Sequence, residues 1–172
     1  MRNAFSNRAF SDRPASWFGI SAAVIALDQF VKWIVLGYFS GRGPVEPVTS
    51  FFNLVLACNK GAAFSFLADA PGWQTPLFAG FAVVASAVVG VLIVRNPGKR
   101  LFCGALALVL GGALGNLIDR LRLGCVVDFL DFHAAGWHWP AFNVADSAIT
   151  LGAVALILES FLKNASADAR QV

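Results

Sequence analysis

Charged residues are scarce in this chain of 172 residues: Asp, Glu, Lys and Arg make up 13% of it, against roughly 25% in ordinary soluble domains. Hydrophobic residues make up 58%. This combination indicates an integral membrane protein, and the length suggests one domain. The net charge of +3 would also suit nucleic acid, but the basic residues cluster outside the apolar segments and mark membrane topology. We therefore expect membrane lipid as a partner, and no nucleic acid.

Cysteines are also few. Cys58, Cys103 and Cys125 show no metal-ligand spacing and are too few for a disulfide framework. Cys103 lies inside an apolar run, so we expect a small buried side chain. Cys58 and Cys125 could face the same compartment, but a bridge between them is not favoured.

The two histidines give little support for a metal site. The zinc-protease motif H-E-x-x-H does not occur in the sequence. His133 and His138 could bind a metal with Asp128 or Asp131, but their spacing is nonspecific. We therefore expect neither a metal nor a cofactor.

Four apolar runs are long enough to cross a bilayer, for which about 20 residues suffice. They cover residues 15–39, 75–94, 101–118 and 141–162. Lys and Arg concentrate before the first run, between the second and third, and after the fourth. The positive-inside rule therefore places both termini in the cytoplasm. We expect cytoplasmic tails at 1–14 and 164–172 and one membrane domain at 15–163.

The loop at 40–73 is then extracytoplasmic. Within it, residues 49–58 are rich in aromatic and β-branched residues, which predicts a short pair of strands. NKGAAFSF follows, and it predicts a glycine turn and then a short apolar segment that ends before Pro71. This segment could lie in the membrane interface. Residues 124–132 alternate loosely and predict an extended segment.

Polar residues inside apolar runs need a reason, because they are costly in lipid. Asp28 and Lys32 are four residues apart and share a helix face. Two readings stay open: the pair neutralises itself against other helices, or it contacts substrate or the loops of the site. Gly111 and Gly115 have a spacing that lets helices approach closely, or they leave space for a bound chain.

Residues 111–150 hold four of the ten acidic residues: Asp119, Asp128, Asp131 and Asp146. Counting 1.5 Å per residue places Asp119 about 28 Å along the third run and Asp146 about 7 Å inside the fourth, near one outer plane. Depth alone therefore makes these two the natural pair. Asp119, which lies beside Arg120 and can pair with it, is, however, also the best candidate for a purely structural role.

Two close carboxylates share one proton, so the ionised member can take a proton from water while the neutral member donates one to a carbonyl oxygen. Such a pair hydrolyses amides without a covalent intermediate. A small proton-coupled transporter or binding subunit could use the same acids as relays. The acids gather at one face, however, and do not mark a path through the membrane.

Five sequence blocks resemble the lipoprotein signal peptidase (signal peptidase II) family, the aspartic membrane proteases of bacteria. The blocks are Asp28–Lys32, NKGAAF at 59–64, GGALGNLIDR at 111–120, VVDF at 126–129 and FNVADS at 142–147. They occur in the family's order, and the resemblance covers about residues 15–162. The resemblance implies an all-α membrane fold of four transmembrane helices, with a small extracytoplasmic β-rich cradle and a short interfacial helix.

The resemblance also implies the reaction, which removes signal peptides from diacylglyceryl-modified prolipoproteins just before the lipidated cysteine, at the outer face of the bacterial inner membrane. It assigns the catalytic pair to Asp128 and Asp146, and leaves Asp131 as a surface residue. We expect a monomer. The residues implied to bind substrate or support the pair are Asp28, Lys32, Asn59, Gly61, Gly112, Asn116, Asp119, Arg120, Asn143 and Ala145.

Overall fold

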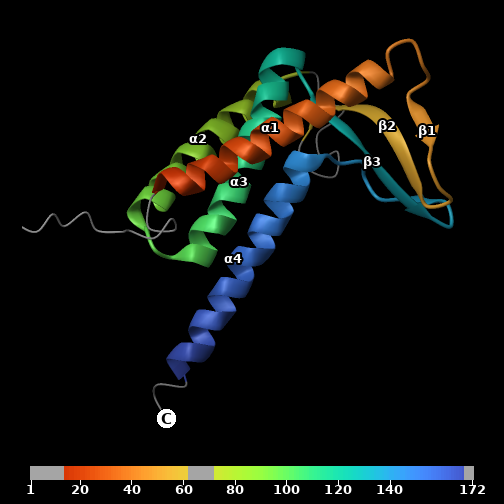
Figure 1. Cartoon of the computed structure of the whole chain (residues 1–172). Coiled ribbons are helices and arrows are strands. Elements are labelled where there is room, and N and C mark those ends of the chain that lie inside the picture. Colours follow the sequence, from red (N-terminus) through yellow and green to blue (C-terminus); the bar gives the residue numbers. More distant parts are fainter. Residues whose placement is uncertain (1–13, 62–71, 169–172) are drawn as a thin grey trace, which may run out of the picture.

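The computed structural model describes residues 14–61 and 72–168 of the chain. In this part, four helices form a bundle, and a small sheet lies at one end of it (Figure 1). The expected architecture of four apolar helices with a small sheet is confirmed. The interfacial segment expected before Pro71 falls within residues 62–71 and lies outside the described residues.

Each helix is long and apolar enough to span a membrane. The helices are α1 (Pro14–Tyr38), α2 (Gln74–Arg95), α3 (Arg100–Leu123) and α4 (Val144–Asp168). Their bounds agree with the predicted runs within a few residues, except that α3 continues past residue 118 and α4 continues past residue 162. Helix α3 ends at Gly124, whose φ of 74° closes the helix in the left-handed conformation. Asp119 and Arg120 therefore belong to a helix.

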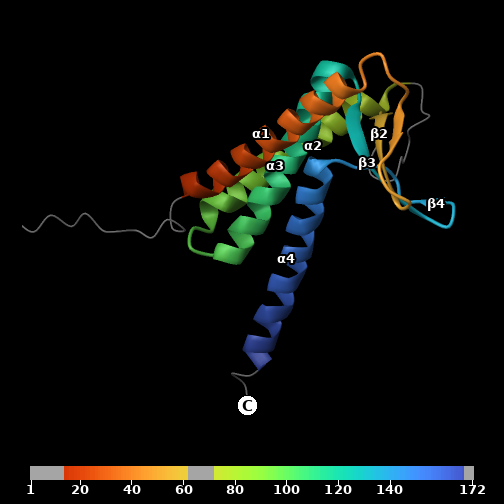
Figure 2. The same ribbon diagram turned by 45° about the vertical axis from the view of Figure 1, so that its right-hand side comes forward.

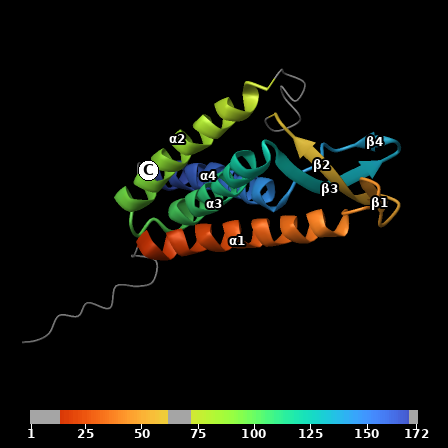
Figure 3. The same cartoon turned by 90° about the horizontal axis from the view of Figure 1, so that it is seen from above.

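The central helix is α3, which contacts α1, α2 and α4 (Figure 3). Its glycines allow backbones to touch. A Cβ added to Gly111 would lie 2.7 Å from Val24 Cβ on α1, and one added to Gly115 would lie 2.9 Å from Asp28 Oδ2 on α1 and 3.4 Å from Ala145 Cβ on α4. The close-approach reading of these small residues is confirmed. The alternative, that the glycines leave room for a bound chain, is wrong, because neighbouring helices fill the space.

The sheet is antiparallel with the strand order β1-β2-β3-β4. Its strands are β1 (Val45–Pro47), β2 (Phe52–Asn59), β3 (Val126–Ala134) and β4 (Trp137–His138). The predicted strand pair is present but begins earlier, and the predicted extended segment is β3. Ala135 and Gly136 both have positive φ in the two-residue turn between β3 and β4, as the right-handed twist of a hairpin favours. Figure 2 shows this hairpin pointing away from the helices.

An apolar cluster fixes the sheet on the bundle. Val35 and Phe39, at the end of α1, pack with Phe129 of β3, and each is about 4% exposed or less. Because side chains alternate across a strand, the neighbouring Asp128 points to the other side of β3. The packing of Phe129 therefore determines where Asp128 is presented.

Candidate active site

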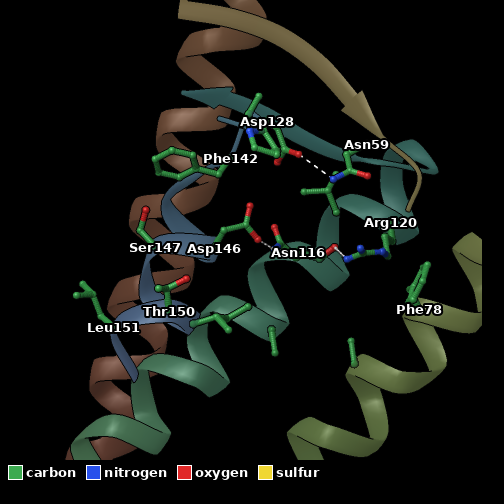
Figure 4. A pocket seen from close by; sticks show the side chains of 16 residues that line it. Asn59, Phe78, Asn116, Arg120, Asp128, Phe142, Asp146, Ser147, Thr150 and Leu151 are labelled. Atoms are coloured by element: carbon green, nitrogen blue, oxygen red, sulfur yellow. Dashed lines mark hydrogen bonds between the residues drawn. The ribbon is translucent and has the colours of Figure 1, made fainter. Parts of the chain in front are cut away.

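A cavity of about 610 Å³ lies where α3, α4, β2 and β3 meet. Asp128 and Asp146 both line it, one from β3 and one from the first turn of α4 (Figure 4). Asp119 is not among the lining residues. This cavity therefore does not bring together Asp119 and Asp146, the two acids that depth alone favoured. Other residues that line the cavity are Asn59, Phe78, Asn116, Arg120, Phe142, Ser147, Thr150 and Leu151.

Side-chain amides connect the two carboxylates. Asn143 donates from Nδ2 to Asp128 Oδ1 over 2.7 Å, and Asn59 donates to Asp128 Oδ2 over 3.0 Å. Asn116 donates from Nδ2 to Asp146 Oδ1 over 2.8 Å, and its Oδ1 accepts from Asn143 over 3.3 Å. These bonds hold both acids in fixed orientations toward one cavity.

The sequence FNVADS places Asp146 through a capping box. Asn143 Oδ1 accepts from the backbone N–H of Asp146 over 2.9 Å, and Asp146 Oδ2 accepts from the backbone N–H of Asn143 over 3.3 Å. This reciprocal pattern satisfies two N–H groups that the start of a helix leaves free. The first turn of α4 and the carboxylate are therefore fixed by the same two residues.

The surroundings of Asp128 favour its protonated form. Asp128 is buried, with 2% of its surface exposed. Burial, and next the negative charge of Asp146, raise the pKa of Asp128 to about 7, against the opposing hydrogen bonds from Asn59 and Asn143. Near neutral pH, the pair can therefore hold one proton.

Lys32 is buried beside the pair and has two acidic partners. Its Nζ lies 2.8 Å from Asp28 Oδ2 and 2.8 Å from Asp119 Oδ2, and it donates to Asn116 Oδ1 over 3.0 Å. The reading in which Asp28 and Lys32 neutralise each other against other helices agrees with these contacts. A third charge, Asp119, completes the cluster. Buried charges persist only when they are paired in this way.

Asp28 and Asp119 each accept a hydrogen bond from the backbone N–H of the residue that precedes one member of the pair. Ala145 N donates to Asp28 Oδ1 over 2.9 Å, and Val127 N donates to Asp119 Oδ2 over 3.1 Å. Ala145 precedes Asp146, and Val127 precedes Asp128. Lys32 therefore links Asp28, which holds the backbone beside Asp146, to Asp119, which holds the backbone beside Asp128.

Gln29 is part of this support, and the sequence did not single it out. Its Nε2 donates to Asp119 Oδ1 over 2.9 Å, to Asp28 Oδ2 over 3.2 Å and to Gly115 O over 3.2 Å. Its position beside Asp28 in an apolar run was the available signal, because an uncharged amide in lipid also needs partners.

Arg120 does not pair with Asp119, which corrects the expected contact between these neighbours. Consecutive residues on a helix point in different directions. Arg120 instead donates to Gly61 O over 2.9 Å and to Asn116 O over 3.4 Å, and its guanidinium lies 5.7 Å from the ring centroid of Phe78. It therefore ties the end of the β2 segment to α3 at the rim of the cavity.

Asp131 is not the surface residue that was expected. It is 7% exposed, and it accepts hydrogen bonds from Asn53 over 2.8 Å and from His138 Nδ1 over 2.9 Å. Burial alone would raise the pKa of Asp131, but these hydrogen bonds outweigh it and hold the pKa below its usual value. Asp131 therefore stabilises the sheet, apart from the cavity.

Cys58 and Cys125 form a disulfide bridge across 67 residues, which was not favoured from the sequence. The spacing of cysteines cannot show that β2 and β3 bring these two together. Cys103 is a free buried thiol, as expected. Across residues 14–61 and 72–168, no group of three or more His, Cys, Asp or Glu side chains could hold a metal ion. His138 is held by Asp131 instead.

Fold and site together define a four-span membrane protein with two carboxylates in a cavity at one end of its bundle. Residues 20–162 match the signal peptidase (SPase) II family. The chain belongs to this family of membrane peptidases, and its spans are those of a multi-pass protein of the bacterial inner membrane.

Individual relatives agree with this assignment. A lipoprotein signal peptidase of Cupriavidus necator is 54% identical over 154 residues, covering 90% of this chain and 87% of the relative. One of Paraburkholderia phytofirmans is 57% identical and covers 84% of each chain. A bacterial membrane enzyme solved by the in meso method superposes with a TM-score of 0.74 at 29% identity, covering 88% of this chain and 90% of that one.

Proposed function

We propose that the chain is an aspartic endopeptidase in which Asp128 and Asp146 form the catalytic pair. The observation that carries the proposal is that both carboxylates line one cavity and are linked through Asn116 and Asn143. The family match supports the reaction class, and the shared cavity supports the choice of these two acids, because they are the acidic residues among its lining side chains.

The chemistry follows from a pair that shares one proton. The ionised carboxylate takes a proton from a water molecule, whose oxygen attacks the scissile carbonyl carbon. The neutral carboxyl group, which near neutral pH is that of Asp128, donates its proton to the carbonyl oxygen. As the tetrahedral intermediate collapses, the carbon–nitrogen bond breaks and the leaving amine takes a proton from the pair. No covalent enzyme intermediate forms.

The substrates are diacylglyceryl-modified prolipoproteins, which are cleaved just before the lipidated cysteine. The named activity of the relatives supports this substrate class. The lining of the cavity also supports this substrate class, because it combines polar groups with apolar side chains such as Phe78, Ile149 and Leu151. A tethered substrate can place its amide at the acids while its acyl chains stay in lipid.

The remaining residues of the site are proposed to support the pair. Asp28, Lys32, Asp119 and Gln29 hold the two backbone segments that carry the acids. Gly112 and Ala145 let α3 and α4 touch, since a Cβ on Gly112 would collide with Ala145 O. Asn59, Gly61 and Arg120 form the rim at the end of β2.

The sheet and cavity are proposed to face the outside of the inner membrane. Both tails, 1–14 and 164–172, then lie in the cytoplasm. The membrane domain at 15–163 is proposed to act as a monomer. The described start of α1 and the end of α4 both lie away from the sheet (Figures 1 and 2). The Cys58–Cys125 bridge also supports this orientation, because disulfides persist in oxidising compartments.

Incubation of the purified protein with a lipidated prolipoprotein tests the function. We expect release of the signal peptide, with the same rate in the presence of a chelator. Loss of cleavage on chelation, with recovery on adding zinc, would contradict the metal-free mechanism. Solute uptake by reconstituted protein without proteolysis would support the transporter alternative instead.

A further inference from the structure

The disulfide lies close to Asp128 of the proposed catalytic pair, because Ala57, which precedes Cys58, is opposite Asp128 in the strand register. Cys58 is the last residue but one of β2, and Cys125 immediately precedes β3. In the register of the two strands, Cys58 is opposite Val127 and Asn59 is opposite Val126. Asn59, which follows Cys58 in the chain, donates to Asp128, and Val127, which lies opposite Cys58, donates to Asp119.

The end of β2 has few other attachments to β3. The pairing shifts register between Leu54 and Ala57, and only three residue pairs follow the shift: Ala57 with Asp128, Cys58 with Val127, and Asn59 with Val126. Short ladder ends with few buried contacts open at low free energy. Cys58 and Asn59 are not fully buried, whereas Cys125 and Val126 are. A covalent tie at this place therefore restrains the strand end that carries Asn59.

Asn59 is the residue through which such a restraint affects Asp128. It touches one oxygen of Asp128 through Nδ2, while its Oδ1 accepts from the backbone N–H of Gly61 over 2.9 Å. Gly61 O in turn accepts from Arg120. Movement of the strand end would therefore remove a hydrogen bond from Asp128 and release the guanidinium at the rim.

We infer that the Cys58–Cys125 bridge is a clamp that positions Asn59 against Asp128, and that a dithiol reductant lowers peptidase activity by opening it. Cys58 and Cys125 are thus positioning residues for the reaction. The inference rests on the proposed function of Asp128 and Asp146. It adds to that function a dependence on the redox state of the compartment that the sheet faces.

The redox step needs only a dithiol as co-reactant. A thiolate of the dithiol attacks Sγ of Cys58, the more exposed of the two sulfurs, and the bond to Cys125 breaks, so that Cys125 leaves as a thiolate. The second thiol of the reductant then displaces Cys58. The protein gains two electrons and two protons, and the dithiol becomes a cyclic disulfide.

The test compares the oxidised protein with the same protein treated with dithiothreitol, using cleavage of a lipidated prolipoprotein across a pH series. Thiol titration of the unfolded protein counts one free thiol, Cys103, before reduction and all three cysteines after it. We expect turnover to fall roughly tenfold on reduction, and to return when the bridge is re-formed. We also expect the limb of the pH profile near pH 7 to move to higher pH, because the lost hydrogen bond from Asn59 had favoured the ionised form of Asp128.

Three variants make the test specific. Cys58→Ser with Cys125→Ser should behave like the reduced protein and should not respond to dithiothreitol. Cys103→Ser keeps the bridge and should respond as the unmodified chain does. In Asn59→Leu, which lacks the positioned amide, dithiothreitol should change neither the rate nor the pH profile further.

An unchanged rate and pH profile in protein with three titratable thiols would overturn the inference. A lower melting temperature on reduction, with the pH profile unmoved, would overturn it equally, since that result describes a general stabilising bridge. If the oxidised protein releases no signal peptide, the proposed function fails instead. The two failures are therefore distinguishable.

Discussion

Four aspartates at the site, three buried and one half-buried, have the same side chain but different partners. Asp28 and Asp119 each lie 2.8 Å from the ammonium group of Lys32, so their charges are neutralised. Asp128 and Asp146 receive amide donors and face the cavity. The carboxylates that face the cavity are therefore the two whose hydrogen-bond donors at the site are neutral amides.

The pH dependence of turnover tests the protonation of the pair. Because burial raises the pKa of Asp128 to about 7, the shared proton is bound below this pH and is lost above it. We expect kcat to fall on the alkaline side, approaching about tenfold per pH unit, when cleavage is measured from about pH 5 to about pH 9. The apparent value belongs to the coupled pair and not to either residue alone. A rate that rises steadily through this range would show that the proton is not required.

Asn143 combines two tasks that substitutions can separate. It caps α4 through Oδ1, and it donates to Asp128 through Nδ2. In Asn143→Ser the cap is retained but the donor to Asp128 is lost, so we expect a melting temperature near that of the unmodified chain and turnover reduced about 100-fold. Asn143→Ala should lose the cap as well, which costs about 1 kcal/mol of stability. Equal melting temperatures for the two variants would contradict the capping role.

The sequence predicted which side chains gather at this end of the bundle better than it predicted their partners. Asp28 and Asp146 stand out because acids are rare in apolar runs, and Asp119 and Asp128 stand out because they belong to the blocks of the family resemblance. The pairing of Lys32 with Asp119 spans 87 positions of chain, and it depends on how α1 packs on α3. Only this packing shows that Arg120 points away from its neighbour Asp119. The bridge and the buried environment of Asp131 were missed for the same reason.

Among the elements, α3 places the site, because it contacts each of the other helices and contributes Asn116, Asp119 and Arg120. The spans themselves were predictable, since length and hydropathy alone define them. The strand order was not, because β2 and β3 are separated by α2 and α3 in the sequence. Hydrophobic alternation shows that a strand is present but does not identify its neighbour.

The contact of α3 with α4 can be tested by adding one methyl group. In Gly112→Ala the new Cβ would lie 2.3 Å from Ala145 O and 2.7 Å from Ile149 Cγ1, so α4 must shift. Because Asp146 lies next to Ala145, we expect turnover to fall by about 100-fold or more. Gly104→Ala is the matched control on the same helix, since its nearest neighbour is Trp17 Cζ3 at an ordinary 3.4 Å. Similar activities in the two variants would contradict a tight contact between α3 and α4 at the site.

At the scale of the whole molecule, the bundle lies in lipid and the sheet stands at one end of it, next to the cavity (Figure 1). Large apolar side chains such as Trp33 and Phe81 are more than 70% exposed, as lipid-facing residues are. The site thus lies where a membrane-tethered peptide arrives by lateral diffusion. The fold therefore places the cavity at the membrane depth that such a peptide reaches.

Cysteine labelling tests the orientation of the molecule. The native cysteines give little background, because Cys58 and Cys125 are bridged and Cys103 is buried. We expect a membrane-impermeant maleimide to label Gly43→Cys in intact spheroplasts and to label Pro97→Cys only after permeabilisation. These positions lie in the loops at opposite ends of the bundle, and neither is buried. Labelling in the reverse order would contradict an outward-facing sheet.

The most direct measurement of the central claim is the single-turnover rate of prolipoprotein cleavage by Asp128→Asn and by Asp146→Asn. Asp131→Asn, on the same strand as Asp128, is the control for removing a buried carboxylate that does not line the cavity. With folding verified by thermal unfolding, the account predicts a loss of roughly 1,000-fold or more for each of the first two variants and a rate within about tenfold of the unmodified chain for the control. A folded Asp128→Asn or Asp146→Asn protein that cleaves at a near-normal rate would contradict the assignment of the catalytic pair.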